Sequence, residues 1–139
     1  MSPVLRFAVL NHDWPRPHRD LLLERGGVLK AWRLPAEFNL SDAIPAVESF
    51  DHRLHYLDYE GPVPGDRGTV GRWDGGALHW LIVREGRCVV RLDGAKLTGV
   101  FEMVRGEGGW RFSAVGQVHP ADLDPPVGDG DGLQQGAGA

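Results

Sequence analysis

Three side chains that can bind a divalent metal lie close together near the start of the chain. His12, His18 and Asp20 fall within nine positions. On a strand, the i, i+2 pair His18 and Asp20 points to one face and can hold the same ion. Pro15 and Pro17 exclude a continuous helix or ladder strand between the histidines, so we expect a loop that returns His12 toward His18. Two imidazoles and one carboxylate leave open coordination positions, as a catalytic metal site requires.

Composition limits what kind of protein could carry such a site. The chain has 139 residues, of which 42% are hydrophobic, so we expect one globular domain with its own core. No apolar run approaches the ~18 residues of a membrane span, and the first residues lack the pattern of a signal peptide. These features predict a soluble, cytoplasmic protein without a membrane partner. The single cysteine, Cys88, excludes an internal disulfide and a cysteine metal cluster, and we expect a small buried hydrophobe.

The distribution of charge bears on nucleic-acid binding. The net charge is −4, but four of the nineteen acidic residues lie in the last twenty positions, which leaves fifteen acidic and fifteen basic residues before them. Thirteen of the fifteen basic residues are arginines, whose planar guanidinium group suits phosphate. A neutral body argues against tight non-specific binding along a duplex. Binding at the end of a nucleic acid is compatible with this charge.

Short segments rich in β-branched and aromatic residues recur along the chain, separated by glycine, proline and charged turns. The polar connection between residues 36 and 50 is expected to contain a helical turn after Ser41. About eight strands without a long amphipathic helix predict an all-β fold, a closed or nearly closed antiparallel barrel with long loops. The expected strands are residues 5–10, 18–24, 28–34, 69–73, 77–83, 86–92, 97–105 and 110–115.

The barrel is expected to occupy residues 1–119. The remaining residues, 120–139, are acidic and rich in glycine and proline, with almost no large apolar side chains. Such a segment cannot bury enough surface to offset the entropy of ordering. We therefore expect a disordered tail.

Several short motifs follow one another in a fixed order along the chain. The first is the set of His12, His18 and Asp20. The further motifs are Gly27–Pro35, Asp51-His52 with Tyr56, Asp58–Gly61, Pro64-Gly65, Gly68–Val70, Trp73–Gly75, and Leu92–Gly99 leading to Met103–Arg105. In this order, over roughly residues 5–115, they resemble the 3′-phosphoesterase domain of bacterial ligase D proteins and its stand-alone relatives.

This resemblance implies a small β-barrel that processes the 3′ ends of broken DNA. It implies a divalent metal, typically Mn²⁺, held by His12, His18 and Asp20. The implied reaction removes a 3′-phosphate, and in some members a terminal ribonucleotide, to leave a 3′-hydroxyl. His52 and Tyr56 match the residues that contact the phosphate and are the expected catalytic pair. The implied partners are DNA 3′ ends such as a primer-template, and a DNA ligase or polymerase.

The chain departs from the family pattern at three positions. Leu22 stands two residues after Asp20, where the family has an arginine that binds the phosphate, and Leu10 and Phe50 replace polar residues. On a strand, Leu22 shares the face of His18 and Asp20, so an apolar side chain occupies the place of a cation. Loss of a charge-assisted phosphate contact would cost about 1.5 to 3 kcal/mol, or roughly ten- to a hundredfold in rate.

Other residues near this set could complete the site. Lys30, on the strand expected beside it, is the first choice for the missing cation, and Arg33 and Arg53 are alternatives for binding phosphate. Asp13 and Asp51 could orient the ligand imidazoles through hydrogen bonds. A solvated surface position is the alternative for both carboxylates and for Lys30.

Two other functions stay open. Loss of the family arginine could leave a weak or inactive member that binds DNA ends or a repair partner. The pair His18 and Asp20, with a distant histidine, also matches the facial triad of non-haem iron oxygenases. The chain is short for that class, and His12 supplies the third ligand without a distant one. Trp14 lies between the two histidines, where it could stack on a base or serve only for packing.

Overall fold

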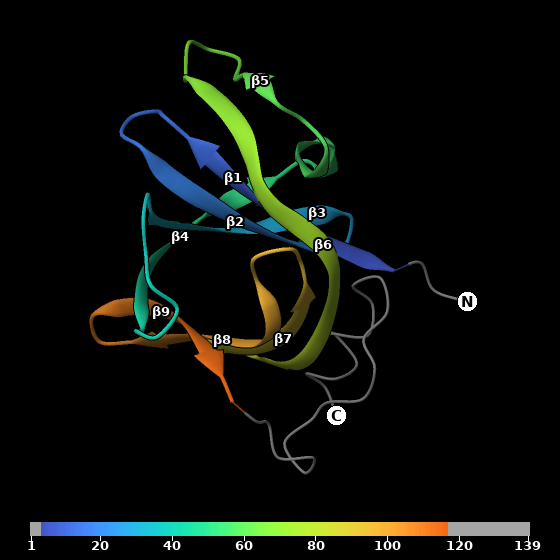
Figure 1. Ribbon diagram of the computed structural model, residues 1–139, viewed down its shortest axis with the longest axis vertical. Helices are drawn as coiled ribbons and strands as arrows, with labels where there is room; N and C mark the ends of the chain where they lie inside the picture. The colour runs from blue at the N-terminus through green and yellow to red at the C-terminus, as the bar shows by residue number, and fades with distance from the viewer. Residues whose placement is uncertain (1–3, 117–139) are drawn as a thin grey trace.

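Each strand of the structure runs antiparallel to the strands beside it. The computed structural model describes residues 4–116 (Figure 1). A 3-10 helix, η1, spans Leu54–Leu57. The strands are β1 Leu5–His12, β2 His18–Arg25, β3 Val28–Pro35, β4 Ile44–His52, β5 Gly61–Pro62, β6 Thr69–Arg84, β7 Arg87–Asp93, β8 Thr98–Gly106 and β9 Gly109–Val115.

The sheet closes on itself into a barrel. Its strands follow the order β1-β2-β3-β4-β9-β8-β7-β6-β5, and β1 also pairs with β6. The long strand β6 allows this closure, because residues 70–78 pair with β1 and residues 77–84 pair with β7. In Figure 1, β6 runs from the half of the molecule that holds β1–β3 to the half that holds β7 and β8. The predicted closed antiparallel barrel of about eight strands is confirmed.

The prediction of two separate strands at residues 69–73 and 77–83 is wrong. Strand β6 runs unbroken through both segments. The glycines between them suggested a turn, but they mark a close approach of two backbones. A Cβ atom on Gly76 would lie 2.1 Å from the carbonyl oxygen of Asp93, so a residue without a side chain is needed where β6 passes the end of β7.

The prediction of a polar connection over residues 36–50, with a helical turn after Ser41, is also wrong. Its second half forms β4, which pairs with β3 and with β9. Only the first part of β4 faces the core, where Ile44 and Ala46 are buried. The rest of the strand is largely exposed, so its sequence lacks the apolar alternation typical of a strand. Ser41 lies in a turn that precedes β4.

Strands β1 and β2 are buried on both faces. Their inner faces contribute to the main core inside the barrel, with Phe7, Val9, Leu21 and Leu23. Their outer faces contribute to a smaller core, whose member Leu57 comes from η1. Helix η1 therefore covers the outer face of these strands. The smaller core consists of Ala8, Leu10, Leu22, Leu29, Ala31, Leu57 and Val70, with Tyr56, Tyr59 and Val63 packed against it.

Three further predictions concern the cysteine, the C-terminal segment and membranes. Cys88 is buried in the main core, as expected, and burial raises the pKa of its thiol to about 12. The predicted tail, residues 120–139, and the predicted boundary before it lie outside the described residues. Within residues 4–116, no helix is long and apolar enough to cross a membrane.

Candidate metal centre

A hairpin places the three metal-binding candidates together. Strands β1 and β2 pair so that His12 lies opposite His18, and Leu10 lies opposite Asp20. Directly opposite residues project to the same face of an antiparallel sheet. Here this is the outer face that also carries the smaller core, since Leu10 belongs to that core. Residues 13–17 connect the strands, so the predicted loop that returns His12 to His18 is confirmed.

Nitrogen and oxygen atoms of these side chains converge. Oδ2 of Asp20 lies 3.0 Å from Nδ1 of His12, and Oδ1 lies 2.9 Å from Nε2 of His18. One ligand atom from each residue lies within 4.8 Å of the other two. His18 and Asp20 are buried, and His12 is half-buried. In residues 4–116, no other group of three such residues has this geometry.

Backbone carbonyls fix which ring nitrogen faces Asp20. Nδ1 of His18 lies 2.8 Å from the carbonyl oxygen of Arg16, and Nε2 of His12 lies 2.8 Å from the carbonyl oxygen of Arg67. A carbonyl oxygen only accepts, so both of these nitrogens carry hydrogen. In the neutral rings, the nitrogens that face Asp20 therefore present lone pairs. Two lone pairs and a carboxylate repel one another unless a proton or a metal ion lies between them.

This arrangement shifts the pKa values of His18 and Asp20 in opposite directions. Burial is the largest influence on His18 and disfavours its charged form, but hydrogen bonds to Asp20 and Arg16 and the charge of Asp20 outweigh it and raise the pKa of His18. Burial also disfavours the ionised Asp20. Hydrogen bonds and charges of His18 and His12 outweigh it and hold the carboxyl pKa below its ordinary value. The donor set fits a divalent ion, which would take the place of the bridging proton.

A cavity of about 460 Å³ opens beside these residues. His12 and Asp20 line one side of it, together with Leu10 and Val70. A cavity of this size, with apolar walls and a few polar groups, is typical of a small-ligand site. Its aromatic and cationic lining consists of Trp14, Phe50, His52 and Tyr56, and of Arg33, Arg53 and Arg67.

The predicted catalytic pair reaches the cavity from two different elements. His52 ends β4 and lies opposite Leu29 of β3, whereas Tyr56 lies in η1. The two rings are edge to face, with centroids 5.8 Å apart. Nδ1 of His52 lies 2.9 Å from the carbonyl oxygen of Phe50 and therefore carries hydrogen. Nε2 of His52 is thus the atom left to meet a ligand.

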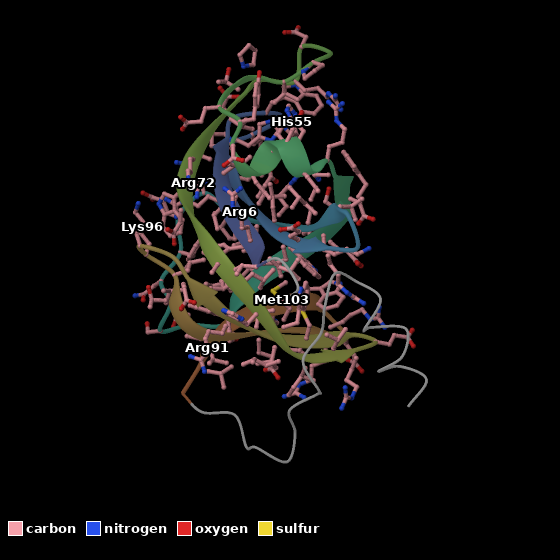
Figure 2. All side chains as sticks on the ribbon, turned by 90° about the vertical axis from the view of Figure 1, so that its right-hand side faces the viewer. Arg6, His55, Arg72, Arg91, Lys96 and Met103 are labelled. Carbon is pink, nitrogen blue, oxygen red and sulfur yellow. The ribbon has the colours of Figure 1, made fainter. Side chains whose placement is uncertain are left out.

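Two arginines hold η1 and the residues after it against the barrel. Arg6 of β1 donates to both carboxylate oxygens of Asp58, at 2.5 and 3.1 Å. The side chain of Arg72 of β6 donates to the carbonyl of Leu57 at 2.6 Å, and its amide donates to Glu60 at 2.7 Å. Figure 2 shows Arg6 and Arg72 beside η1, on which His55 is labelled. Sequence reasoning missed both arginines, because their partners are up to 52 positions away.

The predicted phosphate-binding cations differ in their surroundings. Arg33 and Arg53 line the cavity, whereas Lys30 does not. Lys30 pairs with Asp51, with Nζ 3.2 Å from Oδ2. Arg33 has no carboxylate partner among residues 4–116, and its charge counteracts the rise in the pKa of His18. Arg33 is therefore better placed to bind a phosphate in the cavity than Lys30, which was the first choice from the sequence.

The carboxylates expected to orient the imidazoles contact other groups. Asp13 accepts a hydrogen bond from the amide of Thr69 at 2.7 Å, and Asp51 pairs with Lys30. The carbonyls of Arg16 and Arg67 orient the rings instead. Sequence reasoning missed the Arg67 carbonyl because 55 positions separate it from His12, and no local pattern links them.

Sequence comparison decides the family. The DNA Ligase D 3′-phosphoesterase domain matches residues 10–105, a span that contains the three metal-binding candidates, His52 and Tyr56. The chain belongs to this family.

The chain spans only a small part of the length of the curated relatives it matches. The multifunctional non-homologous end joining protein LigD of Pseudomonas aeruginosa is 38% identical over 112 residues. The multifunctional non-homologous end joining DNA repair protein LigD of Mycobacterium tuberculosis is 32% identical over 111 residues. Each match covers 73% of this chain but only 13% and 15% of the respective relative.

Some motifs shared with the 3′-phosphoesterase domain support the barrel rather than the cavity. Asp74, in the motif Trp73–Gly75, is buried. Its carboxylate accepts hydrogen bonds from three successive amides, those of residues 95–97, at 2.8, 3.0 and 2.6 Å. These amides belong to the motif Leu92–Gly99 and lie between β7 and β8. The two motifs therefore form one structural unit outside the candidate metal centre.

Proposed function

We propose that this 3′-phosphoesterase domain removes a phosphate, or a terminal ribonucleotide, from DNA 3′ ends with a divalent ion, most suitably Mn²⁺. His12, His18 and Asp20 would hold the ion. The observation that supports this best is the convergence of two imidazole lone pairs and a carboxylate beside a cavity lined by arginines. A bound ion would withdraw charge from the phosphoryl group and keep positions open for its oxygens.

The cavity side chains would bind the rest of the phosphate. A phosphomonoester is a dianion, so its hydrolysis needs positive charge and hydrogen-bond donors around the non-bridging oxygens. Arg33 and Arg53 line the cavity without carboxylate partners among residues 4–116, and guanidinium groups bind phosphate in pairs of hydrogen bonds. The Tyr56 hydroxyl can donate a further hydrogen bond.

His52 is the proposed proton donor. Its Nδ1 is committed to the carbonyl of Phe50, so Nε2 is the atom that meets the substrate. When water attacks phosphorus and the bond from phosphorus to the 3′-oxygen breaks, Nε2 of the protonated ring donates its proton to that oxygen, which leaves a 3′-hydroxyl and inorganic phosphate. The T-shaped contact with Tyr56 limits how far the His52 ring can turn.

We assign the reaction to the repair of broken DNA, because the relatives are named as non-homologous end joining proteins. The proposed substrate is the 3′ end of a DNA strand, as in a primer-template. A DNA ligase or a polymerase is the proposed protein partner.

A second function is favoured by two apolar side chains, Leu10 and Leu22, on the sheet face that carries the candidate ligands. Leu10 lines the cavity, and Leu22 occupies the position of the family arginine. If Arg33 and Arg53 do not replace that arginine in the transition state, the domain would bind 3′-phosphorylated ends with little or no turnover. Binding without product distinguishes this function from catalysis.

A 3′-phosphorylated primer-template incubated with Mn²⁺ tests the proposal. We expect a 3′-hydroxyl product, detected by extension with a polymerase, and its loss in His12→Ala. His79→Ala is the matched control, because His79 is an exposed histidine near Asp93 and does not line the cavity. Bound but unprocessed DNA would select the end-binding function. Product undiminished in His12→Ala would refute the assigned metal ligands.

A further inference from the structure

The cavity has an aromatic rim, formed by Trp14 and Phe50, that has no role in the proposed phosphate chemistry. Among residues 4–116, five large hydrophobic side chains are exposed, and two of them are aromatic. These two, Trp14 at 42% and Phe50 at 69% exposure, both line the cavity. Exposed aromatic side chains gathered at one site indicate a partner with an apolar face of its own.

Phe50 presents one open face of its ring. The other face is stacked on His52, with centroids 5.0 Å apart and planes inclined by 7°. Because 69% of Phe50 is exposed, the face away from His52 is available to a ligand. A flat group stacked on this open face would be separated from His52 only by the ring of Phe50. His52 is the residue proposed to meet the phosphate.

Arginines without carboxylate partners surround this rim. Arg33, Arg53 and Arg67 line the cavity, and Arg16 lines an adjoining hollow together with His18 and Arg33. None of the four is paired with a carboxylate in residues 4–116. Two carboxylates, Asp20 and Asp51, also line the cavity, but Asp51 is paired with Lys30, so the three arginines leave an excess of positive charge there. Such a distribution suits a short anionic end better than a long duplex.

The cavity is large enough to hold one nucleotide. Its volume is about 460 Å³, within the range of pockets that hold one small molecule. A paired base could enter only with its partner base attached. An unpaired base can enter alone, and every base has a flat π-face that stacks on aromatic rings without sequence preference.

We propose that Phe50 stacks on the 3′-terminal base of a DNA strand when that base is unpaired, with Trp14 on the wall formed by the β1–β2 loop. The preferred substrate is then a primer-template whose 3′-terminal base is frayed. This inference rests on the proposed function for the position of the terminal phosphate. The stacking contact itself needs neither a metal ion nor turnover, so it can be measured separately.

Fluorescence anisotropy of the metal-free full chain, in the presence of a chelator, tests the contact. The first probe is a labelled single-stranded DNA with a 3′-phosphate, and the second is the same strand without its terminal base. We expect the first to bind about tenfold more tightly, the effect typical of one stacked base. We also expect it to bind more tightly than the same strand in a blunt duplex.

Substitutions of Phe50 separate stacking from general apolar contact. Phe50→Leu should lose most of the preference for the terminal base, whereas Phe50→Tyr should keep it. Val4→Ser is the control, because Val4 is 63% exposed and does not line the cavity. Phe50 is a surface residue, so these variants should fold.

Three results would overturn the inference: equal binding of the two single strands, a base preference that survives in Phe50→Leu, or a blunt duplex bound as tightly as the single strand. Dephosphorylation with Mn²⁺ but without a base preference would leave the proposed reaction intact and refute only the stacking. A base preference without any 3′-hydroxyl product would support the stacking and refute the proposed reaction.

Discussion

Arg33 lies directly opposite Asp20 across the pairing of β2 and β3. Opposite residues share a face of the sheet, so Arg33 belongs to the same outer face as the metal-binding candidates. The position two residues after Asp20, where the resemblance implies an arginine, holds the buried Leu22. Arg33 therefore brings a cation to this face from the neighbouring strand. We propose that it replaces the missing phosphate contact.

Substitution of Arg33 tests this replacement. Arg33→Met should lower kcat/KM for a 3′-phosphorylated primer-template by about ten- to a hundredfold, because a charge-assisted hydrogen bond contributes roughly 1.5 to 3 kcal/mol. Lys30→Met should change it by less than about threefold, since Lys30 is an exposed residue paired with Asp51. The opposite order of effects would identify Lys30 as the phosphate-binding cation.

Binding of Mn²⁺ should depend on pH through His18. The pKa of His18 is raised above 6.5, so at lower pH a proton occupies the nitrogen that the ion needs. We expect the affinity for Mn²⁺, measured by titration calorimetry, to increase from about pH 6 to about pH 8 by more than tenfold. An affinity that does not change over this range would contradict the assignment of His18 as a ligand.

The stability of the metal-free chain should depend on pH through Asp20 and His18, whose pKa values shift in opposite directions. The lowered pKa of Asp20 stabilises the fold above pH 3.8, and this contribution is lost as the pH falls through the lowered value. The raised pKa of His18 stabilises the fold below pH 6.5, and this contribution is lost as the pH rises through the raised value. Both act together between pH 3.8 and 6.5. Urea denaturation of Asp20→Asn should show a weaker maximum in this range than the unsubstituted chain.

Leu22 should contribute to stability rather than to chemistry. It is fully buried in the smaller core that also contains Leu57 of η1. Leu22→Ala should lower the free energy of unfolding by about 2 to 5 kcal/mol, whereas Leu22→Met should cost less than about 1.5 kcal/mol. Urea denaturation measures both. A loss in Leu22→Ala no larger than in Leu22→Met would show that this core is loosely packed.

Asp74 should also act through the fold. Asp74→Ala leaves three amides without their acceptor, which should lower the free energy of unfolding by about 2 to 4 kcal/mol. The folded variant should bind Mn²⁺ with unchanged affinity, because Asp74 does not line the cavity. A selective loss of Mn²⁺ affinity at temperatures where the variant is folded would instead connect Asp74 to the metal centre.

The convergence of His12, His18 and Asp20 could be predicted from the sequence because it depends on local geometry. The i, i+2 spacing of His18 and Asp20 and the prolines before them are sufficient to predict a hairpin that returns His12 to the pair. The sequence also contains a local indication that Arg33, rather than Lys30, lies beside Asp20, and sequence reasoning missed it. The two-residue turn after Arg25 sets the register of β2 and β3, which pairs Asp20 with Arg33 and leaves Lys30 opposite a core leucine.

Other features could not be predicted because they depend on contacts between distant segments. The Arg67 carbonyl reaches His12 across 55 positions, and Arg6 reaches Asp58 across 52. Strand β4 escaped detection because much of it is exposed and its pattern does not alternate. The closeness of Phe50 to the cavity follows from that strand, so it became visible only in the structure.

His12, His18 and Asp20 are proposed to bind a single divalent ion. Titration of the metal-free chain with Mn²⁺, followed by electron paramagnetic resonance and calorimetry, measures this directly. We expect one ion per chain, lost in Asp20→Ala and retained in His79→Ala. Saturable binding of one ion that survives unchanged in Asp20→Ala, or no binding by the unsubstituted chain, would contradict the assignment of these three residues as ligands.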